Sequence, residues 1–157
     1  MRIPLSALIG LTLTGMFLFV ALFAPWLAPY AIDDNTGAQW EGMSAVHWLG
    51  TDTIGRDILS RLIYGAQITI FVALASSILS FSLGAFLGFT AAVQGGWIDQ
   101  ALSRLVDLVM AIPSLIIALV VLTIMSPNLI VLILIMGLLD STRVFRLSRA
   151  VAADIAV

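Results

Sequence analysis

The side chains that most often carry out catalysis are scarce in this sequence, and they are scattered along it. The 157 residues include one histidine, His47, and no cysteine, which excludes a thiolate metal site and a disulfide framework. A metal site needs several converging ligands, and His47 has no such neighbours in the sequence. No nucleophile–base pair, catalytic carboxylate pair or phosphate-binding glycine loop stands out. We therefore predict a protein that is not an enzyme and that holds no metal and no cofactor.

Charged residues at helical spacing suggest ion pairing instead of bond chemistry. Asp52 is placed to cap a short amphipathic helix that begins near Thr53, with Asp57 and Arg61 paired four residues apart. Such a helix lies along a membrane face and either receives a soluble partner or completes the bundle, the structural role being favoured.

A second charged pair and a proline lie further along the chain. Arg104 and Asp107 are spaced for an ion pair that lowers the cost of placing charges near hydrocarbon. Pro113 lies within an apolar stretch and is expected to kink its helix. A kink of this kind either lines a transport path or serves packing alone, and packing is the more common reason.

The composition places these groups in a membrane. Hydrophobic residues make up 61% of the chain and charged residues 10%, against roughly 25% in soluble domains. The mean hydropathy is +1.13. Seven arginines, no lysine and nine acidic residues give a net charge of −2, so no basic patch is available for nucleic acid. These values exclude a cytosolic enzyme and a disordered tail.

The apolar stretches predict an all-α, polytopic transmembrane helix bundle in a single domain over residues 1–157. Because a span needs about 20 apolar residues, we expect four spans, at about 5–27, 68–93, 108–125 and 129–147. Ser126, Pro127 and Asn128 separate the last two spans with turn-forming residues. A polar external loop occupies about residues 33–61. A cleaved signal peptide is the disfavoured alternative for the first span, because its apolar core is too long.

The arginines predict the orientation of these spans in a bacterial inner membrane. With both termini cytoplasmic, five arginines lie inside and only Arg56 and Arg61 lie outside, which follows the positive-inside tendency. A reading with three spans would reverse this bias.

Small side chains recur every fourth residue in the second span and form one stripe. Such a stripe allows another helix backbone to approach closely, which is a main source of helix association in lipid. The partner is either a helix of the same chain or a second subunit, and both readings stay open. The stripe comprises Ser76, Ser80, Gly84, Gly88 and Ala92.

Four sequence blocks resemble a known family when they are taken in order. They are residues 47–66 (HWLGTDTIGRDILSRLIYGA), 95–99 (GGWID), 104–107 (RLVD) and 111–115 (AIPSL). They are similar to the peptide/nickel class of inner-membrane permeases in ATP-driven, binding-protein-dependent importers, specifically the second permease of dipeptide and oligopeptide systems. In the first block the family motif is carried by Gly50, Asp52, Gly55, Arg56, Asp57 and Arg61.

The resemblance implies a division of labour among several subunits. Two homologous permeases form the pathway, two cytoplasmic ATPase subunits hydrolyse ATP, and a periplasmic or lipid-anchored solute-binding protein delivers the substrate. The expected cargo is peptides or related small solutes, with nickel complexes and glutathione among the alternatives, and the sequence does not select among them.

The same resemblance implies that a longer chain is usual. Family members have six spans and a cytoplasmic loop that docks the ATPase after the fourth. This chain stops at residues 152–157 (AADIAV), where that loop is expected to begin, so we expect an N-terminal portion that lacks the docking loop. Alternative hypotheses are a non-transporting four-span scaffold or regulator, and a self-assembling channel, for which the chain offers few polar faces.

Overall fold

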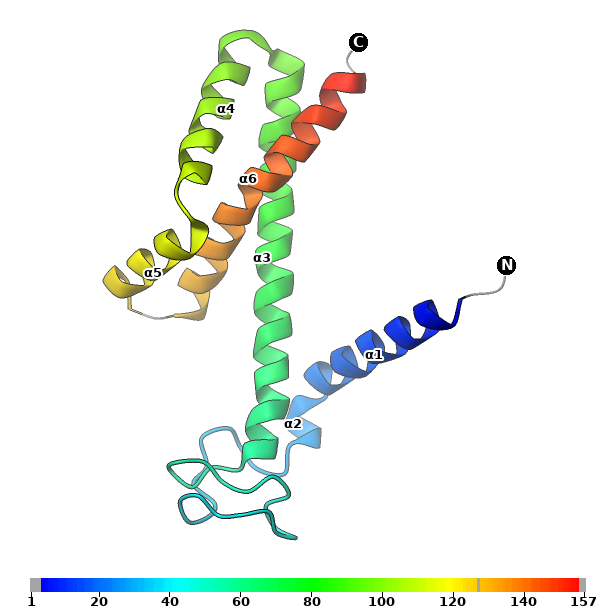
Figure 1. Ribbon diagram of the computed structural model, residues 1–157, viewed down its shortest axis with the longest axis vertical. Coiled ribbons are helices and arrows are strands. Elements are labelled where there is room, and N and C mark those ends of the chain that lie inside the picture. Colours follow the sequence, from blue (N-terminus) through cyan, green and yellow to red (C-terminus); the bar gives the residue numbers. More distant parts are fainter. Residues whose placement is uncertain (1–3, 127, 156–157) are drawn as a thin grey trace. The chain divides into compact units, whose positions relative to one another are not determined.

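The computed structural model describes residues 4–126 and 128–155, and nearly all regular structure in them is helical. The helices are α1 (Leu5–Leu22), α2 (Ala24–Leu27), α3 (Ile58–Gln94), α4 (Gly96–Ala111), α5 (Ser114–Ile124) and α6 (Leu129–Ile155) (Figure 1). Within the described residues no strand forms, and two isolated β-bridges occur in the loop before α3. The chain divides into two compact units, residues 1–71 and 72–157.

Helix α1 is apolar on every side, as expected of a helix in lipid. The hydroxyls of Thr12 and Thr14 donate to the carbonyl oxygens of Leu8 and Gly10, at 2.8 and 2.9 Å, so neither hydroxyl is left without a partner in hydrocarbon. The helix ends at Leu22, and the short α2 follows with Pro25 in its first turn. The predicted helix over 5–27 is therefore present, with one break before the proline.

Helix α3 begins earlier than the sequence patterns predict. It starts at Ile58 rather than near residue 68 and runs without interruption to Gln94. The short helix expected from Thr53 does not form, because residues 53–55 make a turn and the following segment leads directly into α3. The helix ends at Gln94, and Gly95 and Gly96 follow with φ of +57°, a backbone conformation that glycine adopts readily.

The third predicted span is bent. Helix α4 ends at Ala111, Ile112 and Pro113 take extended conformations, and α5 begins at Ser114 after a bend of 81°. A residue before proline is pushed towards the extended region, and the proline ring cannot continue the helix behind it. Pro113 therefore breaks the helix instead of kinking it.

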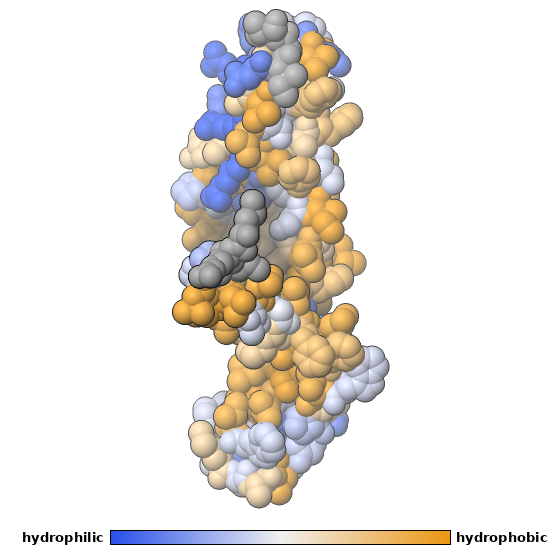
Figure 2. All heavy atoms as spheres, turned by 90° about the vertical axis from the view of Figure 1, so that its right-hand side faces the viewer, coloured by the Kyte–Doolittle hydropathy of each residue, from blue (hydrophilic) through white to orange (hydrophobic). Residues whose placement is uncertain are grey.

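Two helices are long and apolar enough to cross a membrane, α1 and α3, and the bent pair α4–α5 adds a third if it is counted as one span. Helix α6 begins at Leu129, as predicted, but its sequence contains Asp140 and three arginines. The structure thus supports a helical membrane protein with two or three such spans in the described residues, and the predicted count of four is not confirmed. Hydrophobic side chains cover much of the visible surface (Figure 2).

The second unit packs around one aromatic residue. Phe145 of α6 is 2% exposed and contacts Ala91 of α3 and Val106 of α4, with Leu87 and Leu102 at the edge of the cluster. Figure 1 shows the C-terminal part of α3 beside α6. Helix α5 buries none of its side chains within the described chain.

We predict that Gly84→Ala destabilises this unit. An added Cβ would lie 2.5 Å from the Ser141 carbonyl oxygen and 2.6 Å from the Val144 Cβ, so the two helices would have to separate. Overpacking of this kind typically costs about 1–3 kcal/mol. The measurement is the free energy of unfolding in mild detergent, titrated with a denaturing detergent.

Gly65→Ala is the matched control, because it lies on the same helix and an added Cβ there meets nothing within 4 Å. Its higher helix propensity should leave the stability unchanged or raise it. Equal effects of the two substitutions would contradict close α3–α6 packing.

Candidate functional site

Asp52 organises the loop that precedes α3. Its Oδ1 accepts hydrogen bonds from the backbone N–H groups of Ile54 and Arg56, at 2.9 and 3.0 Å. Its Oδ2 accepts from the Arg56 Nε at 3.0 Å and pairs with the Arg61 guanidinium. These contacts, led by the Arg56 N–H, hold the pKa of Asp52 well below its ordinary value. Asp52 thus holds a turn in place. The sequence-based prediction that it caps a helix beginning near Thr53 is wrong.

Asp57 is the residue that caps α3. Its Oδ2 accepts from the Ser60 N–H at 2.8 Å and from the Ser60 hydroxyl at 2.9 Å, which is N-cap geometry for a helix that begins at Ile58. Its Oδ1 lies 3.1 Å from the His47 Nδ1. Burial raises the pKa of Asp57, but the hydrogen bonds from Ser60 and His47 outweigh burial and lower it overall.

His47, Asp57 and Ser60 form a buried polar chain. All three are at most 3% exposed, and the Ser60 hydroxyl accepts the Tyr30 N–H at 3.1 Å. The His47 Nε2 lies 3.9 Å from a Glu41 carboxylate oxygen. These hydrogen-bonded side chains connect the segment after α2 to the first turn of α3, and they therefore hold the loop in its shape.

Two glycines of the predicted motif are required by the backbone. Gly50 and Gly55 have φ of +78° and +81°, and a Cβ at either position would collide with a carbonyl oxygen, that of Glu41 or of Gly37. Between them Thr51 is buried, and its hydroxyl donates to the Ala38 carbonyl at 2.6 Å.

The loop therefore brings together all six residues of the motif, although not in the pairs predicted. The expected ion pair between Asp57 and Arg61 is wrong, because Asp57 binds His47 and Ser60 while Arg61 binds Asp52. Ser60 was not singled out from the sequence. Its position three residues after Asp57 is the N-cap spacing that identifies it.

The stripe of small residues on α3 lies in the second unit, where two of its members contact α6. An added Cβ at Gly84 would meet Ser141 and Phe145 backbone atoms, and one at Gly88 would lie 2.6 Å from the Phe145 carbonyl oxygen. Ser76 and Ser80 are buried, at 9% and 4% exposure, and Ala91 rather than Ala92 belongs to the core cluster.

Two ion pairs join α4 to α6. Arg149 makes two hydrogen bonds to the carboxylate of Asp99, and the Arg146 guanidinium donates to Asp107 at 2.6 Å. The predicted pair of Arg104 with Asp107 is wrong, because Asp107 binds Arg146 across the helix interface. No local pattern indicates the pairing of Asp99, because Arg149 lies fifty residues away in the sequence.

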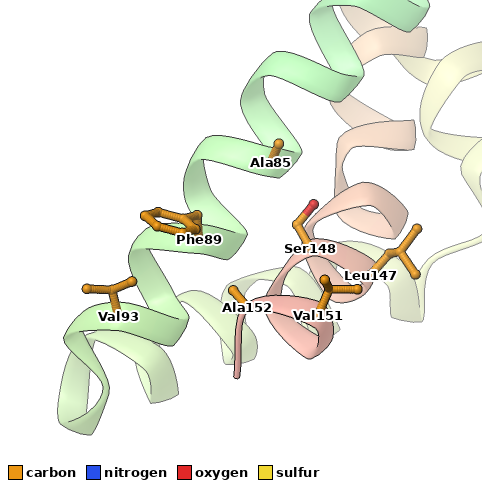
Figure 3. Close-up of a pocket in the computed structure, with 7 residues that line it drawn as sticks. All are labelled: Ala85, Phe89, Val93, Leu147, Ser148, Val151 and Ala152. Atoms are coloured by element: carbon orange, nitrogen blue, oxygen red, sulfur yellow. The ribbon is translucent and has the colours of Figure 1, made fainter. Parts of the chain in front are cut away.

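The α3–α6 pair also forms an open apolar groove of about 640 Å³. Phe89 and Val93 from α3 line this groove together with Leu147 and Val151 from α6 (Figure 3). A second cavity, of about 260 Å³, lies at the break between α4 and α5, where Pro113 faces Asp140 and Arg143 of α6.

The chemistry of these sites is ion pairing and packing. Within residues 4–126 and 128–155 no group of three histidine, cysteine or carboxylate side chains is arranged to hold a metal ion. The second unit instead offers helices that pack closely and charges that are paired between helices.

Comparison with known proteins supplies two family matches. Residues 83–156 match the family described as binding-protein-dependent transport system inner membrane component. Residues 6–41 match the N-terminal transmembrane domain of oligopeptide transport permease C.

Curated relatives carry consistent names. The chain is 38% identical over 125 residues to the dipeptide transport system permease protein DppC of Alkalihalophilus pseudofirmus, which is 78% of this chain and 41% of that protein. It is 37% identical over 152 residues to the di/tripeptide transport system permease protein DppC of Pseudomonas aeruginosa, covering 92% and 50%. For the dipeptide permease DppC of Haemophilus influenzae the identity is 36% over 152 residues, covering 92% and 52%. The chain spans about half the length of these relatives.

We predict that the loop loses stability in acid. A carboxyl whose pKa is lowered on folding stabilises the folded state above its unfolded pKa, near 3.8, and this contribution is lost as the pH falls through the lower folded value. Protection of the loop amides from hydrogen exchange, corrected for the intrinsic rate, should therefore decline below about pH 4. Asp52→Asn should flatten the decline, whereas Asp33→Asn should leave it unchanged.

We also predict measurable coupling between Asp99 and Arg149. A double-mutant cycle with Asp99→Asn and Arg149→Gln should give about 1 kcal/mol, the upper end for exposed pairs, because the pair is bidentate and Asp99 is mostly buried. The cycle of Asp140→Asn with Arg143→Gln is the control. Its atoms are 3.7 Å apart and largely exposed, so its coupling should be near zero. Equal coupling energies for the two pairs would contradict the prediction that the bidentate contact strengthens the Asp99–Arg149 pair.

Proposed function

We propose, on the premise that this chain belongs to the family of binding-protein-dependent transport system inner membrane components, that it forms part of the membrane pathway of an importer for short peptides. The observation that carries the proposal is the family match over residues 83–156, the segment that contains α4, α5, α6 and the end of α3. Relatives that align with most of the chain are named as dipeptide or di/tripeptide permeases.

The partners follow from the same premise. The chain pairs with a homologous permease, two cytoplasmic ATPase subunits act on the pair, and a solute-binding protein delivers the peptide from outside. The chain itself performs no bond chemistry. Transport is a change between two packings of the bundle, and ATP binding shifts their populations.

In this proposal the membrane topology has four crossings, with both termini cytoplasmic. They are α1, α3, the bent pair α4–α5 and α6. The arginines support this orientation, because Arg104, Arg143, Arg146 and Arg149 then share the cytoplasmic side. The loop organised by Asp52 and Asp57 then faces outwards, where it contributes to the surface that receives the solute-binding protein. Its rigid hydrogen bonding suits a docking surface, since little order is lost on binding.

The experiment expresses an affinity-tagged chain, extended by the C-terminal half of the Pseudomonas aeruginosa di/tripeptide permease to supply the expected docking loop, together with the homologous permease, the ATPase and the binding protein, in cells that lack dipeptide uptake. Purification in mild detergent should recover the permease and the ATPase with the chain, and labelled dipeptide should enter cells only when the chain is present. A stable assembly that contains neither partner would support the non-transporting scaffold instead.

We predict that Gly88→Leu abolishes this uptake while Gly65→Leu preserves it. A side chain at Gly88 meets the α6 backbone at Phe145 and Arg149, and the packing there cannot yield without moving α6. The measurement is initial uptake of labelled dipeptide at matched amounts of protein in the membrane. Uptake that persists in Gly88→Leu would show that the α3–α6 contact is not part of the working pathway.

A further inference from the structure

The cavity at the α4–α5 break holds a pair of charges that the bundle does not use for its own packing. Its lining includes Pro113 and Ser114 on one side and Asp140 and Arg143 on the other. Residues 129–139 of α6 are uncharged, so Asp140 and Arg143 are the first charges on an apolar helix. Ionisable groups at such positions are costly, and they usually face a polar cavity and serve a function.

The three arginines of α6 differ in how they are held. Arg146 and Arg149 are hydrogen-bonded to Asp107 and Asp99 of α4. Among the described residues, the ion-pair partner of Arg143 is Asp140, one helical turn away, at 3.7 Å. That distance is beyond the 2.7–2.9 Å typical of a charge-assisted hydrogen bond. The Arg143 guanidinium, 74% exposed, therefore keeps its donors available for a ligand.

The residues of the helix break, Ile112 and Pro113, line the same cavity. Irregular backbone at membrane depth is tolerated where it is buried in protein or lines a water-filled cavity. At the end of α4 the last carbonyl groups lack partners within the helix. The cavity at the break thus combines a cation, an anion and the residues of an interrupted helix in about 260 Å³, just below the roughly 300 Å³ of the smallest ligand pockets.

We propose that this cavity is a subsite for the carboxylate end of a short peptide, an inference that rests on the proposed transport function. The terminal carboxylate binds the Arg143 guanidinium, whose planar fork matches it. Asp140 and the carbonyls at the break accept the adjacent peptide N–H. The nearby Asp140 disfavours a dianion such as phosphate, and the small volume admits one terminal residue and not a whole longer peptide.

The absence of cysteine from the sequence allows a direct test in the membrane-bound chain. Ser114→Cys places a thiol in the cavity lining, and Leu119→Cys, 65% exposed on α5, is the control position. Both are reacted in membrane vesicles with anionic and cationic methanethiosulfonate reagents. The measured quantity is the ratio of the labelling rates of Ser114→Cys with the anionic and the cationic reagent. With Asp140→Asn, which leaves Arg143 as the nearby charge, this ratio should be about fivefold higher than with Asp140→Asn and Arg143→Gln together.

Ligand binding is then read as protection of the same thiol. Glycylglycine should slow labelling of Ser114→Cys, and glycylglycinamide, which lacks the carboxylate, should not. Arg143→Gln should remove the protection, Arg143→Lys should restore part of it, and Arg104→Gln should leave it intact as the charge-matched control. Equal protection by both peptides, no protection by either, or protection that survives Arg143→Gln would overturn the proposal.

The labelling needs neither ATP nor the other subunits, so its outcome is separate from that of the uptake assay. Protection without uptake would keep the carboxylate subsite and count against the transport role. Uptake without protection would keep the transport role and reject the subsite.

Discussion

The close approach of α3 and α6 at Gly84 and Gly88 is the contact on which the second unit depends. In a membrane the lipid tails are as apolar as the side chains, so moving a side chain from lipid into a helix interface gains little hydrophobic free energy. Helices therefore associate through dense packing and through polar contacts. A Cβ at either glycine would lie within 2.6 Å of a carbonyl oxygen of α6, so the backbones meet where side chains are absent. This approach positions Phe145 between α3 and α4 and thereby forms the small core.

The charged residues act differently in the two units. In the second unit they form ion pairs between two helices. Asp99 and Asp107 of α4 hold Arg149 and Arg146 of α6, so two ion pairs tie these helices together beside the small core. Each pair lowers the cost of leaving a charge near hydrocarbon. In the first unit the acidic residues act on their own segment instead. Asp52 and Asp57 accept backbone N–H groups, and these bonds set the loop's shape and the start of α3.

Sequence reasoning predicted the features that depend on local chemistry. The apolar runs predicted α1, the end of α3 and the start of α6. Sequence reasoning failed where the ion-pair partner of a residue lies on another helix, because the spacing of residues along the chain identifies only neighbours on the same helix. Arg104 is three residues from Asp107, yet Asp107 binds Arg146. It also failed at Pro113, where a kink was predicted and the helix instead breaks with a bend of 81°.

The exposed apolar surface of the helices is consistent with assembly from several chains. In the most apolar windows, 6% of the α1 residues and 22% of the α3 residues are buried within the described chain. In water such surfaces would cause aggregation, but in lipid the exchange of acyl chains for another helix changes the hydrophobic free energy little. Association can therefore be decided by shape and by a few polar contacts, which also allows two packings of similar free energy. The close glycine contacts and the charges paired between α4 and α6 are contacts of this kind.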